Sequence, residues 1–78
     1  MFNDTSFLII KSCKPGFKKV IFTQLQLDLL GISLKDAKSN VDKILDDKEV
    51  VLVINDKILF QKFLKEIDDI GLIFQNNL

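Results

Sequence analysis

The stretch GISLKDAKSNVD, residues 31–42, contains the end of one helix and the start of the next. Gly31 is a residue type that ends helices, because it adopts the left-handed backbone conformation without strain. Two residues later, the Ser33 side chain can accept a hydrogen bond from the backbone N–H of Asp36, which approximates a capping box. Apolar residues then recur at helical spacing, at Leu34, Ala37, Val41 and Ile44. The stretch therefore predicts a helical hairpin whose second helix covers residues 34–44.

The segments on either side supply the remaining elements. Residues 19–30, KVIFTQLQLDLL, predict the first helix of the hairpin, with a core-facing stripe of Ile21, Phe22, Leu25 and Leu29. Residues 57–70 predict a third helix, which Asn55 and Asp56 can cap. The core stripe of this third helix is Leu59, Phe60, Phe63, Leu64, Ile67 and Ile70. Apolar runs at residues 7–10, 49–54 and 72–75 predict strands, and the middle run is the clearest because it is continuous and β-branched.

Together these elements predict an α+β fold, a two-layer α/β sandwich in the order β-α-α-β-α-β. Three amphipathic helices would cover one face of a small three-stranded sheet. The chain has 78 residues, which is the length of one domain. We expect residues 1–5 to form a flexible N-terminus and residues 6–78 to form a single domain.

The predicted strands are apolar at both alternating sets of positions. In the middle strand, Val51 and Val53 would face one side of the sheet, and Leu52 and Ile54 the other. An antiparallel sheet with one covered face usually alternates apolar and polar residues. We therefore expect the second face to be covered as well, and a second copy of the chain in a homodimer is the simplest cover.

Given this order of elements, the segment KVIFTQLQLDLLGISLKDAKSNVD, residues 19–42, resembles the C-terminal domain of the bacterial ribosomal stalk protein. The most specific similarity is to the pattern G-x-x-L-K-[DE]-A-K-x-x-V-[DE], which residues 31–42 match without a gap. The resemblance implies the fold given above and a role in recruiting translational GTPases to the large ribosomal subunit. We expect it to extend to the C-terminal domain alone, because no counterpart of the family's N-terminal dimerisation segment and hinge precedes Phe7.

In the stalk family, the factor-binding surface lies on the first two helices. The residues that match the family's pattern there are Lys19, Val20, Gly31, Leu34, Lys35 and Lys38. Thr23, Gln24 and Leu27 complete the outer face of the first helix. Because Gln24 and Leu27 stand where the family has basic residues, the centre of this surface would be aliphatic and polar, with lysines around it.

The composition argues against an enzyme. With no His and one Cys, the chain can build neither a Ser-His-Asp nor a Cys-His nucleophile, nor a Cys and His metal site. We therefore expect no catalytic residue, no cofactor and no bound metal. Eleven basic residues balance eleven acidic ones, so binding to nucleic acid would be weak. Lys11, Lys14, Lys18 and Lys19, with Phe17 among them, resemble a small phosphate-binding patch, although a solvated loop is the simpler interpretation.

Three features of the sequence indicate the cellular compartment of the protein. Cys13 has no second cysteine with which to form an internal disulfide, which favours a reducing compartment. No N-terminal segment combines a basic start with an apolar stretch, as a signal peptide does. The longest apolar run, residues 50–54, is too short to span a membrane. We expect a cytoplasmic protein.

Two functional hypotheses follow from the sequence. The first is a non-catalytic protein-interaction module that docks a protein partner through the outer face of its first two helices. The second is a self-associating structural domain that forms a homodimer through the uncovered face of its sheet.

Overall fold

The computed structural model describes residues 6–76, which form three strands and three helices. In chain order these are β1 (Ser6–Cys13), α1 (Lys19–Leu30), α2 (Leu34–Leu45), β2 (Val50–Ile54), α3 (Lys57–Asp69) and β3 (Leu72–Asn76). The predicted α+β fold and its order β-α-α-β-α-β are confirmed. The segment that we expected to be a flexible N-terminus, residues 1–5, lies outside the described residues, as do residues 77–78.

β1 is the central strand of an antiparallel sheet with the order β2-β1-β3. It extends over eight residues, beyond the predicted residues 7–10, because its two neighbours pair with different parts of it. β2 pairs with the first part, where Ser6 faces Ile54, and β3 continues to the far end, where Cys13 faces Leu72. A register shift between Ile10 and Ser12 interrupts the pairing with β3.

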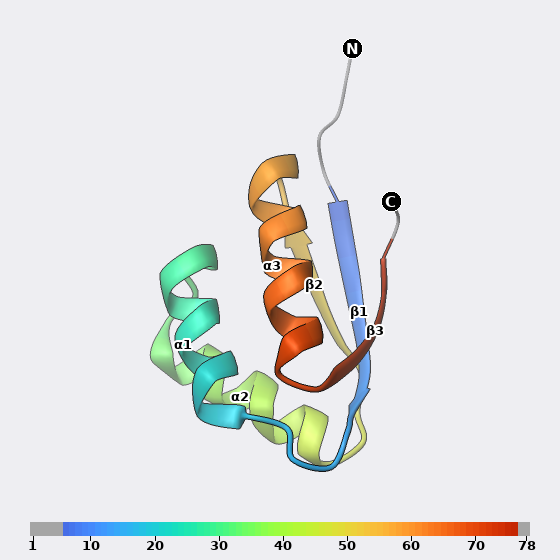
Figure 1. Cartoon of the computed structure of the whole chain (residues 1–78). Helices are drawn as coiled ribbons and strands as arrows, with labels where there is room; N and C mark the ends of the chain where they lie inside the picture. Colours follow the sequence, from blue (N-terminus) through green and yellow to red (C-terminus); the bar gives the residue numbers. More distant parts are fainter. Residues whose placement is uncertain (1–5, 77–78) are drawn as a thin grey trace.

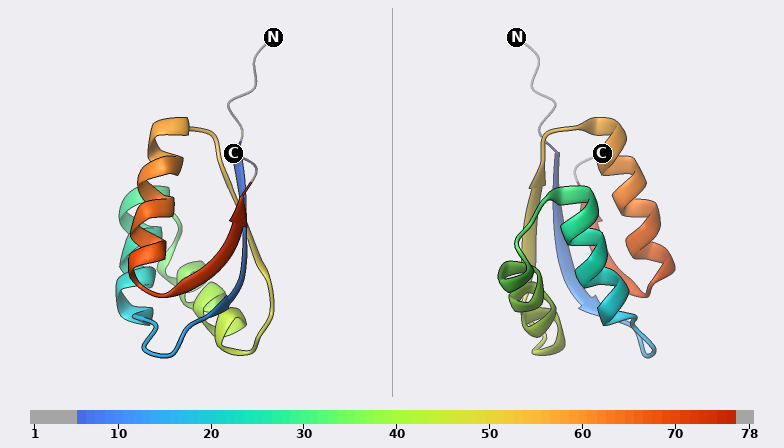
Figure 2. Two further views of the ribbon diagram at one scale, coloured as in Figure 1. Left: turned by 45° about the vertical axis from the view of Figure 1, so that its right-hand side comes forward. Right: turned by 90° about the vertical axis from the view of Figure 1, so that its left-hand side faces the viewer.

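All three helices pack on one face of the sheet, so the domain has two layers (Figures 1 and 2). The hydrophobic core lies between these layers. Alternate strand residues point into it, and Leu8, Ile10 and Leu72 are almost completely buried. The helices contribute the largest fully buried side chains, Phe22, Phe60 and Phe63. The predicted core stripe of α3 is thus confirmed at its centre.

The opposite face of the sheet carries the other alternating set of side chains, and no helix covers it (Figure 2, left). The apolar residues of this face, which we term the outer sheet patch, are Phe7, Ile9, Val51, Val53 and Ile73. The exposed fractions are 61% for Val53, 59% for Val51, 45% for Phe7 and 42% for Ile73. The register places Phe7 opposite Val53 and Ile9 opposite Val51, so the patch is continuous across two strands.

The packing of α1 differs from its predicted stripe. Phe22 is fully buried as expected, and Leu25 and Leu29 are partly buried against the core. Ile21, which we predicted to be a core residue, is 44% exposed. The reason is that the second fully buried position of α1 is Gln26, on the side that faces α2. The buried arc is therefore turned toward α2, and Ile21, about 100° from Phe22 around the helix, falls at its edge.

The ends of the helices follow the local signals in the sequence. Gly31 ends α1 in the left-handed conformation, with φ of 65°. Ser33 Oγ accepts a hydrogen bond from the backbone N–H of Asp36 at 3.2 Å, and this starts α2. In the same way, Asp56 Oδ1 accepts from the N–H of Leu59 at 3.0 Å and starts α3. The predicted hairpin boundaries are thus confirmed to within a residue.

The loop between β1 and α1 is tied to the turn that follows α3. The backbone N–H of Lys14 donates to the carbonyl of Gly71 at 2.8 Å, and that of Lys18 donates to the carbonyl of Ile70 at 3.1 Å. The ring of Phe17 packs against Phe22, with the ring centroids 6.0 Å apart. These contacts fix where α1 begins, and so they position the first turn of the predicted partner-binding surface.

Candidate functional site

A hollow of about 240 Å³ lies on the surface between α1 and α2. We term it the helix-pair hollow. The residues that line it are Lys19, Val20 and Thr23 from α1 and Lys38, Val41 and Asp42 from α2. The two helices lie side by side, which brings residues about twenty positions apart in the sequence to one place (Figure 1). Lys19, Val20, Thr23 and Lys38 were all predicted as partner-binding residues from the sequence.

A buried polar contact holds α1 against α2 beneath this surface. The Gln26 side chain is fully buried, and its Nε2 donates to the backbone carbonyl of Ala37 at 3.1 Å. Asn40 Nδ2 donates to Gln26 Oε1 at 2.7 Å. Since a buried amide is costly unless it is hydrogen-bonded, this pair of contacts specifies one relative position of the two helices. Gln26 was not among the residues predicted to be buried, although its spacing of four residues from Phe22 places both on one side of the helix.

The helix-pair hollow combines an apolar wall with charged groups at its margin. The Val20 side chain is 75% exposed, whereas Val41 is only 6% exposed and forms part of the core. Lys19, Lys38 and Asp42 are exposed. The Thr23 hydroxyl donates to the carbonyl of Lys19 at 3.0 Å, so its oxygen remains able to accept a hydrogen bond. An aliphatic centre with polar groups around it is the usual organisation of a protein–protein contact.

The other predicted partner-binding residues lie on the same two helices but do not line the hollow. Gln24 is exposed, and its Nε2 donates to Asp28 Oδ1 at 2.9 Å. Leu27 is half-buried, and Leu34 at the start of α2 is 49% exposed. Lys35 is exposed on the first turn of α2. Gly31 has a structural role, because it ends α1 and turns the chain into α2.

The lysines of this surface are not neutralised within the domain. Among residues 6–76, the only ion pair joins Lys11 Nζ to Glu49 Oε2 at 2.7 Å, on the sheet. Lys19, Lys35 and Lys38 therefore present positive charge that a partner can meet. The alternative phosphate-binding patch is less well formed, because Lys11 is paired with Glu49 and the Phe17 ring is engaged with Phe22.

The described part of the chain offers no other arrangement of chemical interest. It holds no group of three or more His, Cys, Asp or Glu side chains that could bind a metal ion. Cys13 is a free, half-buried cysteine that packs at the margin of the core. None of the three helices between residues 6 and 76 has the length and apolar content that crossing a lipid bilayer requires.

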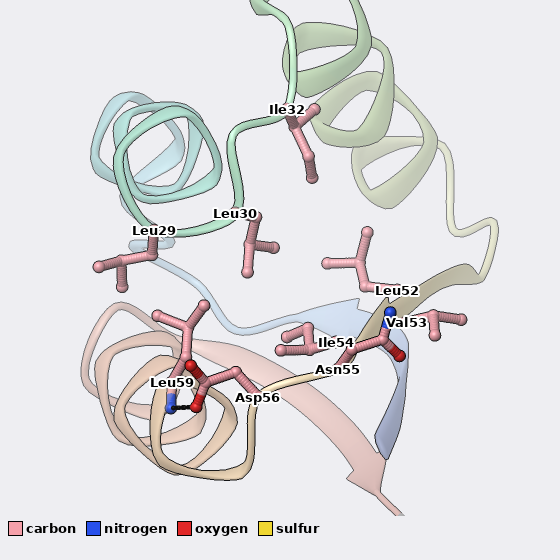
Figure 3. A pocket seen from close by; sticks show the side chains of 9 residues that line it. All are labelled: Leu29, Leu30, Ile32, Leu52, Val53, Ile54, Asn55, Asp56 and Leu59. Carbon is pink, nitrogen blue, oxygen red and sulfur yellow. Dashed lines mark hydrogen bonds between the residues drawn. The ribbon is translucent and has the colours of Figure 1, made fainter. Parts of the chain in front are cut away.

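A larger hollow of about 350 Å³ lies where the turn between α1 and α2 approaches the end of β2. Its lining residues are Leu29, Leu30, Ile32, Leu52, Val53, Ile54, Asn55, Asp56 and Leu59. Figure 3 shows Leu30, Leu52 and Ile54 converging on its centre, while Val53 points away. The Asp56 carboxylate at its margin caps α3 through Leu59, so this polar group already serves the fold. No predicted site residue lines this hollow, and we assign the candidate function to the helix-pair hollow.

Comparisons of the chain with protein-family models, with curated proteins and with solved structures found no match.

Proposed function

We propose that this protein is a non-catalytic interaction module of the cytoplasm that docks a protein partner on the outer face of α1 and α2. The observation that carries the proposal is the helix-pair hollow, where the exposed Val20 side chain shares the lining with Lys19, Lys38 and Asp42. Four of the residues that the sequence predicts for one partner-binding surface, from two helices, line this hollow.

The chemistry of the surface indicates the kind of partner. A partner would insert an apolar side chain against Val20, and its acidic groups would approach the lysines around it. Burial of apolar side chains supplies most of the affinity in such contacts, and the charges supply orientation and speed of association. We therefore propose an acidic protein surface with an exposed apolar residue as the occupant.

The resemblance to the stalk C-terminal domain supports a translational GTPase as this partner. Five of the six residues that line the helix-pair hollow also match the family's sequence pattern: Lys19, Val20, Lys38, Val41 and Asp42. Under this proposal, the chain binds the factor and brings it to another component, and no bond is made or broken on the chain itself.

The test is a titration of the isotope-labelled protein with a purified translational GTPase, followed by NMR of the backbone amides. We expect the largest shift changes at the six residues that line the helix-pair hollow. Added salt should weaken the complex, because the attraction of exposed lysines for acidic groups is screened. Shift changes confined to the sheet, or no binding, would overturn the proposal.

A matched pair of variants sharpens this test. Val20 and Ile58 are both exposed apolar residues in the first turn of a helix, with exposed fractions of 75% and 81%. Val20→Glu places a negative charge in the hollow and should weaken binding at least about tenfold, or about 1.4 kcal/mol. Ile58→Glu, on α3, should leave the affinity unchanged. Equal losses from both substitutions would contradict the assigned surface.

A further inference from the structure

The outer sheet patch is the second surface of this domain that the fold leaves uncovered. Two of its aliphatic residues, Val51 and Val53, are each about 60% exposed, and Phe7 lies directly beside Val53 on the next strand. Water-exposed β-branched residues on a continuous sheet face are unfavourable unless something covers them.

The charges around the patch favour a second copy of the chain. The patch itself contains no charged residue, and the charges at its margin, Lys11 and Glu49, already pair with each other at 2.7 Å. A two-fold axis brings identical surfaces together, so such a surface must complement itself. An aliphatic face without charges complements itself. The helix-pair hollow is less suited to such a contact, because its lining carries the exposed charges of Lys19, Lys38 and Asp42, which lose hydration when they are buried.

The edge of the sheet offers a competing mode of self-association. β2 is an outer strand, since β1 is its only strand neighbour in the described part of the chain. Its sequence, VVLVI, contains none of the charges, prolines or bulges with which proteins protect exposed edge strands. Both the outer face and the outer edge of β2 are therefore suited to a contact that excludes water.

The size of the patch sets the expected strength of the contact. Three strands about 4.8 Å apart, with about 3.3 Å per residue, give a face about 15 Å wide and 17–26 Å long. Two such faces cover about 500–800 Å² in total, which is less than the area of a standard-size interface. We therefore expect a weak dimer that forms at high protein concentration.

We infer that the outer sheet patch is the interface of a homodimer, in which two sheets pack face to face about 10 Å apart to form a second core. Phe7, Val51 and Val53 of each copy lie at the centre of this contact. The helix-pair hollows remain on the outer surfaces of the dimer, so that each copy can still bind a partner.

Sedimentation of the purified protein from micromolar to millimolar concentration tests the inference. We expect the mass to rise from monomer to dimer across this range. A monomer throughout, with partner proteins recovered on the patch instead, would overturn the inference. Isotope-filtered NMR of a mixed sample should show contacts between Phe7 and the valines of the other copy. Contacts only between the backbones of two β2 strands would mean edge pairing and would also overturn it.

Variants distinguish this surface from the partner-binding one. Val53→Glu should weaken dimerisation at least tenfold, whereas Val20→Glu, the same substitution on α1, should leave dimerisation unchanged.

The folding of each variant is checked by the dispersion of its NMR spectrum. If Val53→Glu does not fold, Val53→Thr keeps the β-branched shape and should still weaken the dimer measurably. Dimerisation that is insensitive to both Val53 substitutions, or that is lost with Val20→Glu, would contradict the inference. The Val53→Glu variant should still bind the partner as a monomer, so failure of one proposal is separable from failure of the other.

Discussion

Helices α1 and α3 are almost equal in length, with 12 and 13 residues, but they use their side chains differently. α3 buries Phe60, Phe63 and Ile67 in the core and exposes mostly polar residues on its other side. α1 buries one aromatic ring and one amide, Phe22 and Gln26, and exposes valine and isoleucine. α3 packs against β2, β3 and α1, whereas α1 packs mainly against α2 and α3 and also presents an outer surface.

The difference shows how a functional surface can be recognised in a small domain. When a helix serves packing alone, its hydrophobic period and its buried face coincide. On α1 they diverge, because the polar Gln26 occupies one of its two fully buried positions. An exposed apolar residue does not by itself distinguish the helices, since α3 exposes Ile58 as α1 exposes Val20. Such local inconsistencies mark positions where a requirement other than packing of the isolated domain operates.

Replacement of Phe63 by Ala tests the structural role of α3 and should have the largest effect. Phe63 is fully buried, so its truncation leaves a cavity and should lower the free energy of unfolding by about 3–5 kcal/mol. Urea denaturation measures this change. The control is Ile58→Ala on the same helix, where the side chain is 81% exposed and a change within about 0.5 kcal/mol is expected. A loss of less than about 1 kcal/mol for Phe63→Ala would contradict its place in the core.

Replacement of Gln26 by Ala tests whether α1 depends on its polar contact with α2. The substitution leaves the Asn40 amide and the Ala37 carbonyl without their Gln26 partner, and should cost about 2–3 kcal/mol of unfolding free energy. Gln24→Ala, two residues away, removes an exposed hydrogen bond to Asp28 and should cost less than about 0.5 kcal/mol. Similar losses for the two glutamines would show that the buried contact does not specify the helix pair.

Substitution of Gly31, at the end of α1, should have a smaller effect on the free energy of unfolding. Gly31 has φ of 65°, and a Cβ atom added there would meet no neighbouring heavy atom within 4 Å. The cost of Gly31→Ala is therefore that of the left-handed backbone itself, about 1–2 kcal/mol, measured by thermal or urea unfolding. Gly31→Asn should cost less, because Asn adopts this conformation more readily than Ala. If Asn were as costly as Ala, steric contact rather than backbone conformation would be responsible.

The smallest effect on stability is expected at Val20. Because its side chain is 75% exposed, Val20→Glu should change the free energy of unfolding by no more than about 0.5 kcal/mol. Urea denaturation, performed beside the binding measurement, separates loss of a contact from loss of the fold. A large destabilisation would show that Val20 packs within the domain, and the contrast between α1 and α3 would then be much weaker.

The order and limits of the elements were predictable because their signals are local. The apolar period of α3, the β-branched run of β2 and the Ser33 and Asp56 caps all act within a few residues of chain. The bare outer face of the sheet was also foreseen, since alternation in a strand places Val51 and Val53 together on one face. The extra length of β1 was not, because it depends on pairing with β3 from the far end of the chain.

The candidate site was only partly predictable. Lys19, Val20, Thr23 and Lys38, which the sequence analysis assigned to one surface, line the same hollow. Val41 and Asp42 also line it, but the predicted site did not include them. Periodicity assigns a face to each residue of a helix, but it does not give the rotation of one helix against another. That rotation exposes Ile21 and buries Gln26, and it follows from the contacts of Gln26 with Ala37 and Asn40.

The sequence by itself determined which segments become helices and strands, where they end, and that the sheet would have two apolar faces. Local backbone preferences and hydrophobic periods are sufficient for these properties, because they involve residues close together in the chain. Only the tertiary structure decided which side of α1 faces α2, and therefore which valine and lysines meet in one hollow. Those contacts join residues far apart in the chain, and their energies depend on burial that no single segment contains.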